Sequence, residues 1–204
     1  MDIFADDEER VLYLRHMRQQ CDRFGVTFLA WCLMSNHVHL IAVPAEEKSL
    51  ALGIGEAHRR YTRAKNFSLG VRGYLFQGRF GSCVLDDRHL MVAARYVELN
   101  PVAAGIVDTP EEYEWSSARF HLDGRRKDTL VRDEDRNLKG LGDDWRAFLG
   151  EGVDELEARR LERGLSTGRP VGSEEFVARL EKLTGRRFRP RKPGPPRGRK
   201  RRKR

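Results

Sequence analysis

Two histidines, His37 and His39, stand one residue apart in the apolar run HVHLIAV. Side chains on a β-strand alternate between its two faces, so both imidazoles would point to the same side of a strand formed here. Two imidazole nitrogens on one face can begin a divalent-metal site. The alternative is a pair of ordinary half-buried histidines, and the spacing alone leaves both interpretations open.

A tyrosine and an asparagine show a second useful spacing, since Asn100 follows Tyr96 by four residues in a predicted helix. Residues at i and i+4 share one helical face and lie about 5–6 Å apart, so the phenol and the amide could converge on one point. A phenol can act as a nucleophile, and an amide oxygen can bind a hard metal ion. The alternative is that Tyr96 packs in the core and Asn100 only lies near the helix end.

Basic residues are interleaved with aromatic residues between Arg59 and Arg95, a stretch with eight Lys or Arg and two Asp. Single-stranded nucleic acid offers both phosphates and exposed base faces, so this pattern favours its binding, with a solvated charged surface as the alternative. Tyr61 and Tyr74 compete with Tyr96 as nucleophiles, but neither has a ligand-type residue four positions later. The residues predicted to contact DNA are Arg59, Arg60, Arg63, Lys65 and Arg79.

The segment WCLMSNHVHLIAVP resembles the motif of histidine, hydrophobic residue and histidine in the REP-associated tyrosine transposases, which are single-tyrosine transposases of the HUH type. The resemblance continues in order through RYTRAKNF, YLFQGRF, RYVELNPVAAGIV and YEWSSAR, and it covers residues 2–122. GRPVGSEEF, further along, is similar to a C-terminal extension of some family members. Several motifs in the family's order make the resemblance specific.

The resemblance implies a site and a reaction. Tyr96 would be the nucleophile, and His37, His39 and Asn100 would bind a divalent metal, Mg or Mn. The phenol would attack a phosphate polarised by the metal, cutting single-stranded or hairpin DNA and forming a 5′-phosphotyrosine. Phenolate is a better leaving group than an alkoxide, so a 3′ hydroxyl could later displace it and rejoin the strand. A catalytically inactive DNA-binding protein is the first alternative, and a metal-dependent hydrolase unrelated to DNA is the second.

Hydrophobic periodicity indicates the elements that would position these residues. We expect a helix over residues 6–24, a hairpin of VTFLAWCL and HVHLIAV around Met34 to Asn36, and a helix over residues 49–66. The glycines of VRGYLFQGRFGSCVL favour a looped strand pair. Asp86 or Asp87 would cap the helix that carries Tyr96, and Pro101 would end it.

The fold class expected is α+β, an antiparallel sheet with helices on one face, followed along the chain by a short helical extension. The sheet and its helices, a ferredoxin-like palm, are what the resemblance implies. Helices are expected near residues 153–163 and 174–183, the latter between Ser173 and Gly185. The predicted domains are a transposase domain at 1–122, a helical extension at 123–185 and a basic disordered tail at 186–204. Whether the protein is a monomer or a homodimer stays open.

Charge and cysteine content limit the class of protein. The net charge is +8, and twelve of the 39 Lys and Arg residues lie at 186–204 without any acidic residue, which favours a polyanionic partner. Three widely spaced cysteines and no long apolar run suit a cytoplasmic, nucleoid-associated protein that does not enter a membrane. Family members usually begin with a further strand ending in Gln-Arg-Gly-Asn. The chain starts after it, so we expect the sheet to be one strand short beside the hairpin.

Overall fold

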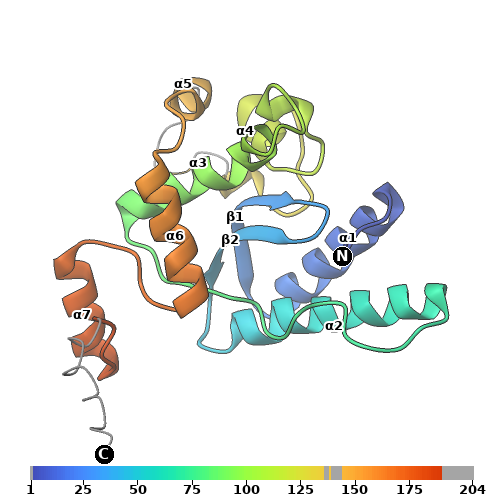
Figure 1. Cartoon of the computed structure of the whole chain (residues 1–204), viewed down its shortest axis with the longest axis horizontal. Helices are drawn as coiled ribbons and strands as arrows, with labels where there is room; N and C mark the ends of the chain where they lie inside the picture. Colours follow the sequence, from blue (N-terminus) through green and yellow to red (C-terminus); the bar gives the residue numbers. More distant parts are fainter. Residues whose placement is uncertain (1, 136–137, 139–143, 190–204) are drawn as a thin grey trace, which may run out of the picture.

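The computed structural model describes residues 2–135, 138 and 144–189. It has an α+β fold in which a two-stranded antiparallel sheet is packed with helices and is followed by further helices (Figure 1). The elements are, in order, α1 (Asp7–Arg23), β1 (Val26–Leu33), β2 (Val38–Pro44), α2 (Ser49–Leu69), α3 (Asp87–Ala103), η1 (Pro110–Glu112), α4 (Ala118–Leu122), η2 (Asp133–Asp135), α5 (Trp145–Gly150), α6 (Glu155–Thr167) and α7 (Glu174–Thr184).

The predicted hairpin is confirmed. β1 and β2 pair antiparallel, with Leu33 opposite Val38 and Cys32 opposite His39. The turn is closed by a hydrogen bond from the Met34 amide to the His37 carbonyl at 2.9 Å. His37 therefore lies at the end of the turn, directly before β2, and His39 lies on the strand.

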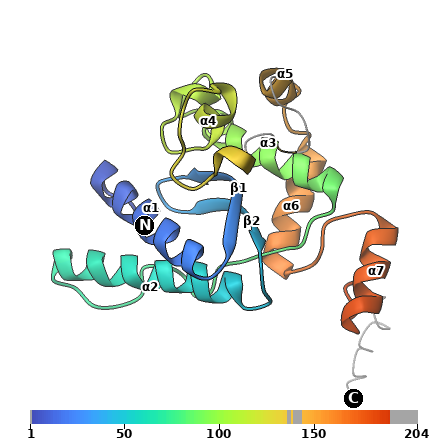
Figure 2. The same ribbon diagram turned by 180° about the vertical axis from the view of Figure 1, so that it is seen from behind.

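Helices cover both faces of the hairpin, so the expectation of helices on one face is wrong (Figures 1 and 2). On one side α1 and α2 pack together around Phe28 of β1, and on the other side α3 and α5 pack around Ala30 and Cys32. The reason lies in VTFLAWCL, an unbroken apolar run that is buried along nearly its whole length. Continuous hydrophobicity, rather than alternation, is typical of a strand covered on both faces.

The other edge of β1 pairs with a non-strand segment. The Leu33 amide donates to the Trp115 carbonyl at 2.8 Å, and the Ser117 amide donates to the Trp31 carbonyl at 3.0 Å. Within residues 2–135, 138 and 144–189, no strand pairs with the outer edge of β2, where Val43 is half exposed.

Helix α3 begins as predicted but does not end at Pro101. The Asp86 carboxylate caps it by accepting from the His89 amide at 2.9 Å. The helix runs through Pro101 to Ala103, and the Ala104 amide still reaches the Asn100 carbonyl at 3.0 Å. A proline removes one amide donor while its fixed φ remains helical, so it is tolerated here within a turn of the helix end. Burial of its ring contributes to this tolerance.

The predicted strand pair in residues 71–85 is also wrong. This segment is a loop that runs along α2, and its ordered sheet contact is one isolated bridge from Leu85 to Val171. Gly73 and Gly78 adopt φ values of 133° and 96°, which interrupt any strand. Phe76 stacks on His58 of α2 with ring centroids 4.1 Å apart, which attaches the loop to the helix.

The two extension helices are confirmed as α6 and α7. Ser173 caps α7 through its hydroxyl, and Gly185 ends it in the left-handed region at φ 66°. None of the helices among the described residues is long and apolar enough to cross a membrane. Most of the basic tail, at 190–204, lies outside the described residues.

Candidate active site

The rings of His37 and His39, the two histidines of the hairpin, face one another. The Nε2 atoms of His37 and His39 are 3.0 Å apart, and the rings meet edge to face with centroids 4.7 Å apart. The other ring nitrogen of His37, Nδ1, lies 2.6 Å from the Asn36 side-chain oxygen. With the Asn36 amide in this orientation its oxygen accepts from Nδ1–H, which leaves the Nε2 lone pair of His37 directed to His39.

The electrostatics keep this pair neutral. Burial, followed by the neighbouring His37, lowers the pKa of His39 to about 4, and burial lowers the pKa of His37 as well. Near neutral pH both rings are uncharged, so both can offer a lone pair. The 3.0 Å contact between the Nε2 atoms is a hydrogen bond when one of them carries its proton, and with both protons on Nδ1 the two lone pairs could together bind a cation.

Helix α3 brings Tyr96 and Asn100 to the same place. It packs against both strands of the hairpin, with Ala93, Ala94 and Val97 buried in between. The Asn100 Nδ2 atom lies 3.3 Å from His39 Nε2, and the Tyr96 ring meets the His39 ring edge to face with centroids 5.5 Å apart.

The donor set suits a divalent metal. Two ligand atoms about 2.1 Å from one octahedral ion, and at right angles to each other, lie about 3.0 Å apart, which matches the separation of the two Nε2 atoms. The described residues contain no group of three His, Cys, Asp or Glu side chains able to hold a metal. The further ligand would be the Asn100 oxygen, which points toward His39 if the amide is turned by half a rotation.

The hydroxyl of Tyr96 contacts a residue that the sequence did not single out. It donates to Glu162 Oε1 of helix α6 at 3.2 Å. Burial, then the Glu162 carboxylate, raises the pKa of Tyr96 above its ordinary value, and a hydrogen bond from Asn100 opposes this. Glu162 is 66 residues away along the chain, and its helical pattern on α6 carries no signal that could have indicated this contact.

The two competing tyrosines are not placed beside the histidines. Tyr61 is fully buried, and its hydroxyl donates to the Ile3 carbonyl at 2.7 Å, so it is not accessible to a phosphate. Tyr74 lies in the loop at 71–85 and is 97% exposed.

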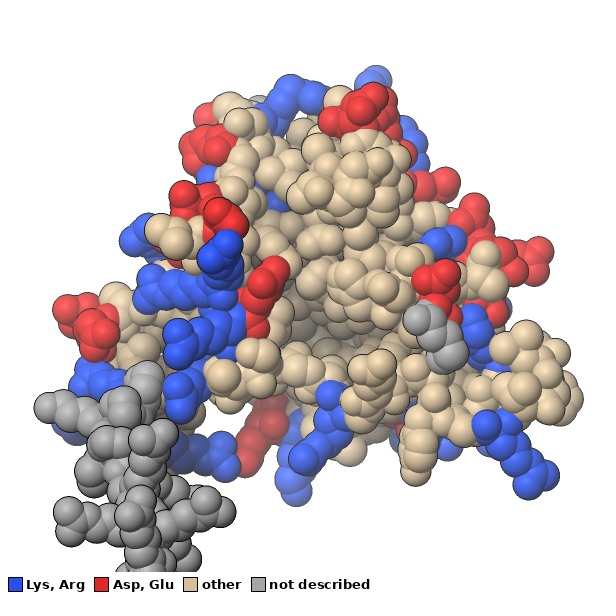
Figure 3. Space-filling view, viewed as in Figure 1, with Lys and Arg blue, Asp and Glu red and all other residues tan. Residues whose placement is uncertain are grey.

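A basic groove runs between α2, the loop at 71–82 and residues 165–168, with a volume of about 1320 Å³. Three of the residues predicted to contact DNA line it, namely Arg59, Arg63 and Arg79. Arg59 and Arg60 both pair with Glu56, at 2.6 and 2.8 Å, which neutralises part of their charge. Figure 3 shows Lys and Arg side chains gathered over α2 along the lower edge and over α6 and α7 at the left.

Lys65 does not belong to this surface. Its side chain is 8% exposed, and its ammonium lies 2.6 Å from Glu9 Oε2 and 2.9 Å from the Ile3 carbonyl. The interpretation of Lys65 as a phosphate contact followed from its position after Tyr61, but both residues face the core. A buried ion pair of this kind leaves no ammonium for DNA, so we assign Lys65 a structural role.

Comparisons with known proteins match the part of the chain that carries these residues. The profile of the family described as "Transposase IS200 like" matches residues 2–100. A Haemophilus influenzae protein named as a REP-associated tyrosine transposase is 26% identical in an alignment of 117 residues, which covers 52% of this chain and 65% of that protein. No solved structure matches. The family match includes His37, His39, Tyr96 and Asn100 and ends before helix α6.

Proposed function

Because residues 2–100 belong to the IS200-like transposase family, we propose that this protein cuts and rejoins single-stranded DNA, including hairpin DNA, through a covalent bond to Tyr96. The observation that carries the proposal is the convergence of Tyr96 and Asn100, from one helical face, on the paired Nε2 atoms of His37 and His39. Residues 1–122 would form the catalytic domain, residues 123–185 a helical extension and residues 186–204 a basic tail.

In the proposed reaction the broken phosphodiester bond is replaced by a phosphotyrosine bond, so the strand can be rejoined without another source of energy. The Tyr96 oxygen attacks the phosphorus, its proton leaves, and the bond from phosphorus to the 3′ oxygen breaks. The products are a 5′-phosphotyrosine and a free 3′ hydroxyl, which takes up a proton. In the second step a 3′ hydroxyl attacks the phosphotyrosine, the phenol leaves and the strand is closed again. Phenol is suited to both steps, since its pKa near 10 makes it a nucleophile and a leaving group.

The residues of this chain fit a divalent ion, Mg or Mn, held by His37, His39 and the oxygen of Asn100. Such an ion would stabilise the negative charge that develops on the phosphate oxygens. The protein's own contribution is orientation: Asn36 fixes the tautomer and the direction of the His37 ring. The packing of α3 on the hairpin fixes Tyr96 relative to both rings.

The groove between α2 and the loop would hold the single strand. Arg63 and Arg79 offer charge for phosphates, and the exposed ring of Tyr74 offers a face for a base. Arg59 and Arg60 would contribute less, because Glu56 shares their charge. The tail at 186–204 would add affinity that does not depend on sequence.

The deciding experiment is covalent trapping on a labelled single-stranded hairpin oligonucleotide in the presence of Mg or Mn. Tyr96→Phe should abolish the denaturation-resistant protein–DNA adduct while DNA binding is retained, because only the attacking oxygen is lost. Tyr74→Phe, an exposed tyrosine, is the matched control and should still form the adduct. An adduct that persists in Tyr96→Phe contradicts the proposed nucleophile.

The metal site is tested separately by titration calorimetry with Mn. His37→Ala and His39→Ala should each lose metal uptake and adduct formation, whereas His16→Ala, on the distant helix α1, should lose neither. Unchanged metal uptake in both site variants would contradict the assignment. DNA binding without any adduct, under either metal, would instead identify an inactive DNA-binding protein derived from a transposase.

A further inference from the structure

We infer that Glu162 positions the nucleophile: its carboxylate accepts the hydrogen bond of the Tyr96 hydroxyl, so the extension completes the active site. The contact joins Glu162 Oε1 to the Tyr96 oxygen across 3.2 Å. The inference rests on the proposed role of Tyr96, and it concerns helix α6, which lies outside the family match at residues 2–100.

The Tyr96 hydroxyl needs such a partner because little else restrains it. The side chain is half buried, and its ring touches His39 only edge to face. Since Glu162 accepts the phenol's proton in a hydrogen bond, it sets the rotation of the hydroxyl and therefore the direction in which the oxygen's lone pairs point.

Glu162 has no competing ion pair within the described part of the chain, although Arg159 and Arg163 lie on the same helix. Arg159 pairs with Glu155 instead, at 2.5 Å. The exposed carboxylate is therefore directed to the phenol and not to a neighbouring cation. A surface glutamate with no such contact would ordinarily remain in water.

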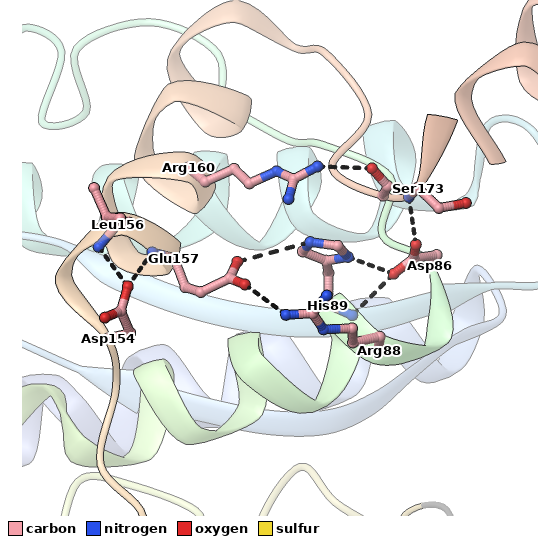
Figure 4. A network of polar contacts seen from close by, with 9 residues as sticks. Asp86, Arg88, His89, Asp154, Leu156, Glu157, Arg160 and Ser173 are labelled. Atoms are coloured by element: carbon pink, nitrogen blue, oxygen red, sulfur yellow. Dashed lines mark hydrogen bonds and ion pairs between the residues drawn. The ribbon is translucent and has the colours of Figure 1, made fainter. Parts of the chain in front are cut away.

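A polar network fixes the start of α6 to the start of α3 (Figure 4). Glu157 Oε1 lies 2.9 Å from Arg88 Nη2, and Glu157 Oε2 lies 3.7 Å from His89 Nε2. Asp86 accepts from His89 Nδ1 at 2.6 Å and from the Ser173 amide at 2.7 Å, which ties in the segment after α6. These contacts precede Glu162 by about one and a half helical turns.

Close packing fixes α6 on the other side of Glu162. Leu161 is buried, and a Cβ atom placed on Gly164 would lie 2.4 Å from Val171 Cγ2 and 3.3 Å from Cys83 Sγ. Only glycine permits this approach of the helix to the neighbouring chain. A helix held before and after Glu162 can place one carboxylate with the precision that a nucleophile requires.

The test measures single-turnover adduct formation by the full chain. Glu162→Ala should slow it by about 100-fold, the order expected for a misplacement of about 1 Å at the reacting atom, with DNA affinity unchanged. Glu162→Gln should restore most of the rate, because the amide oxygen also accepts a hydrogen bond. Glu8→Ala, at an exposed glutamate of helix α1, is the matched control and should keep the parent rate. A parent rate in Glu162→Ala overturns the inference. So does a Glu162→Gln rate as low as that of Glu162→Ala, since the charge and not the acceptor would then be required.

A second measurement keeps the inference testable if the parent protein forms no adduct, which would be a failure of the proposed function alone. Fluorine NMR of the chain labelled with 3-fluorotyrosine gives one signal for each of its five tyrosines, and Tyr96→Phe assigns one of them. Glu162→Ala should shift or broaden that signal, and Glu162→Gln and Glu8→Ala should leave it in place. An unmoved Tyr96 signal in Glu162→Ala would show that the carboxylate does not hold the ring.

Discussion

Replacing Glu98 should destabilise the helix that carries the candidate nucleophile. Glu98 is fully buried on α3 and serves three donors. Its Oε1 accepts from Ser117 Oγ at 2.5 Å and from His121 Nδ1 at 2.6 Å, and its Oε2 accepts from Trp145 Nε1 at 2.7 Å. The carboxylate thereby joins α3 to α4, to the segment beside β1 and to α5. Its removal leaves the His121 and Trp145 donors buried without this acceptor, whereas the Ser117 hydroxyl can still donate to the Trp31 carbonyl, 3.3 Å away.

The magnitude follows from these contacts. A buried donor left without a partner costs about 1–3 kcal/mol, and removal of one member of a buried pair about 3–5 kcal/mol. Glu98→Ala should therefore lower the free energy of unfolding by about 3–5 kcal/mol, out of the roughly 5–15 kcal/mol typical of a domain. Glu98→Gln should cost only about 1–3 kcal/mol, because its oxygen can still serve Ser117 and His121 while its amide group opposes the indole N–H of Trp145.

The assay is urea unfolding followed by far-UV circular dichroism, with m-values compared to confirm that the same surface unfolds. A double-mutant cycle isolates the opposed donors: in the Trp145→Phe background the indole N–H is gone, so Glu98→Gln should cost about 1 kcal/mol less than in the parent. A Glu98→Ala loss within about 0.5 kcal/mol, the range of ordinary surface changes, would refute the reasoning. It would mean that these donors find water or other partners.

Two further predictions concern the basic residues, first Lys65 and Arg63 and then the tail. Lys65→Met should lower the free energy of unfolding, because the buried pair with Glu9 is lost, and should leave the DNA affinity of the folded protein unchanged. Arg63→Met should weaken DNA binding and leave the free energy of unfolding unchanged. The reverse pattern would return Lys65 to the DNA surface. Deletion of residues 186–204 removes twelve cations, so it should weaken DNA binding at low salt and flatten the salt dependence of that binding. The cleavage position on a hairpin should not change. A shifted cleavage position would show that the tail reads sequence.

The helices were predictable because their signals are local. Asp86 and Ser173 each cap a helix through the side chain as expected, and Asp6, which the prediction placed inside the first helix, caps α1 in the same way. The register of the hairpin followed from the apolar runs on either side of a short polar turn. His39 lies on β2 as predicted, and His37, which ends the turn before the strand, still points to the same side, with the two Nε2 atoms 3.0 Å apart.

Other features depend on distant parts of the chain. The loop at 71–85 has apolar residues that suit a strand, but it binds to α2 through Phe76 and His58, which no local pattern reveals. The sequence around Lys65 is typical of a surface cation, but the structure places its ammonium beside Glu9 and the Ile3 carbonyl. The contact from Glu162 to Tyr96 spans 66 residues, so only the packing of α6 on α3 discloses it.

The two opposite faces of helix α3 differ in role: one is buried and fixes the helix, and the other carries Tyr96 and Asn100. At 100° per residue, Ala94, Glu98 and Pro101 fall within one narrow arc, and all three are buried. Tyr96 and Asn100 fall on the other side, half exposed, toward His39. The buried face can be held rigidly, because a carboxylate with three donors tolerates only one position of the helix. The face that carries Tyr96 and Asn100, the proposed reactive face, can then remain accessible while the position of the two side chains stays fixed. This arrangement gives a reason for burying a charged residue two positions from the candidate nucleophile: Glu98 holds the helix in place, and the helix holds the phenol of Tyr96.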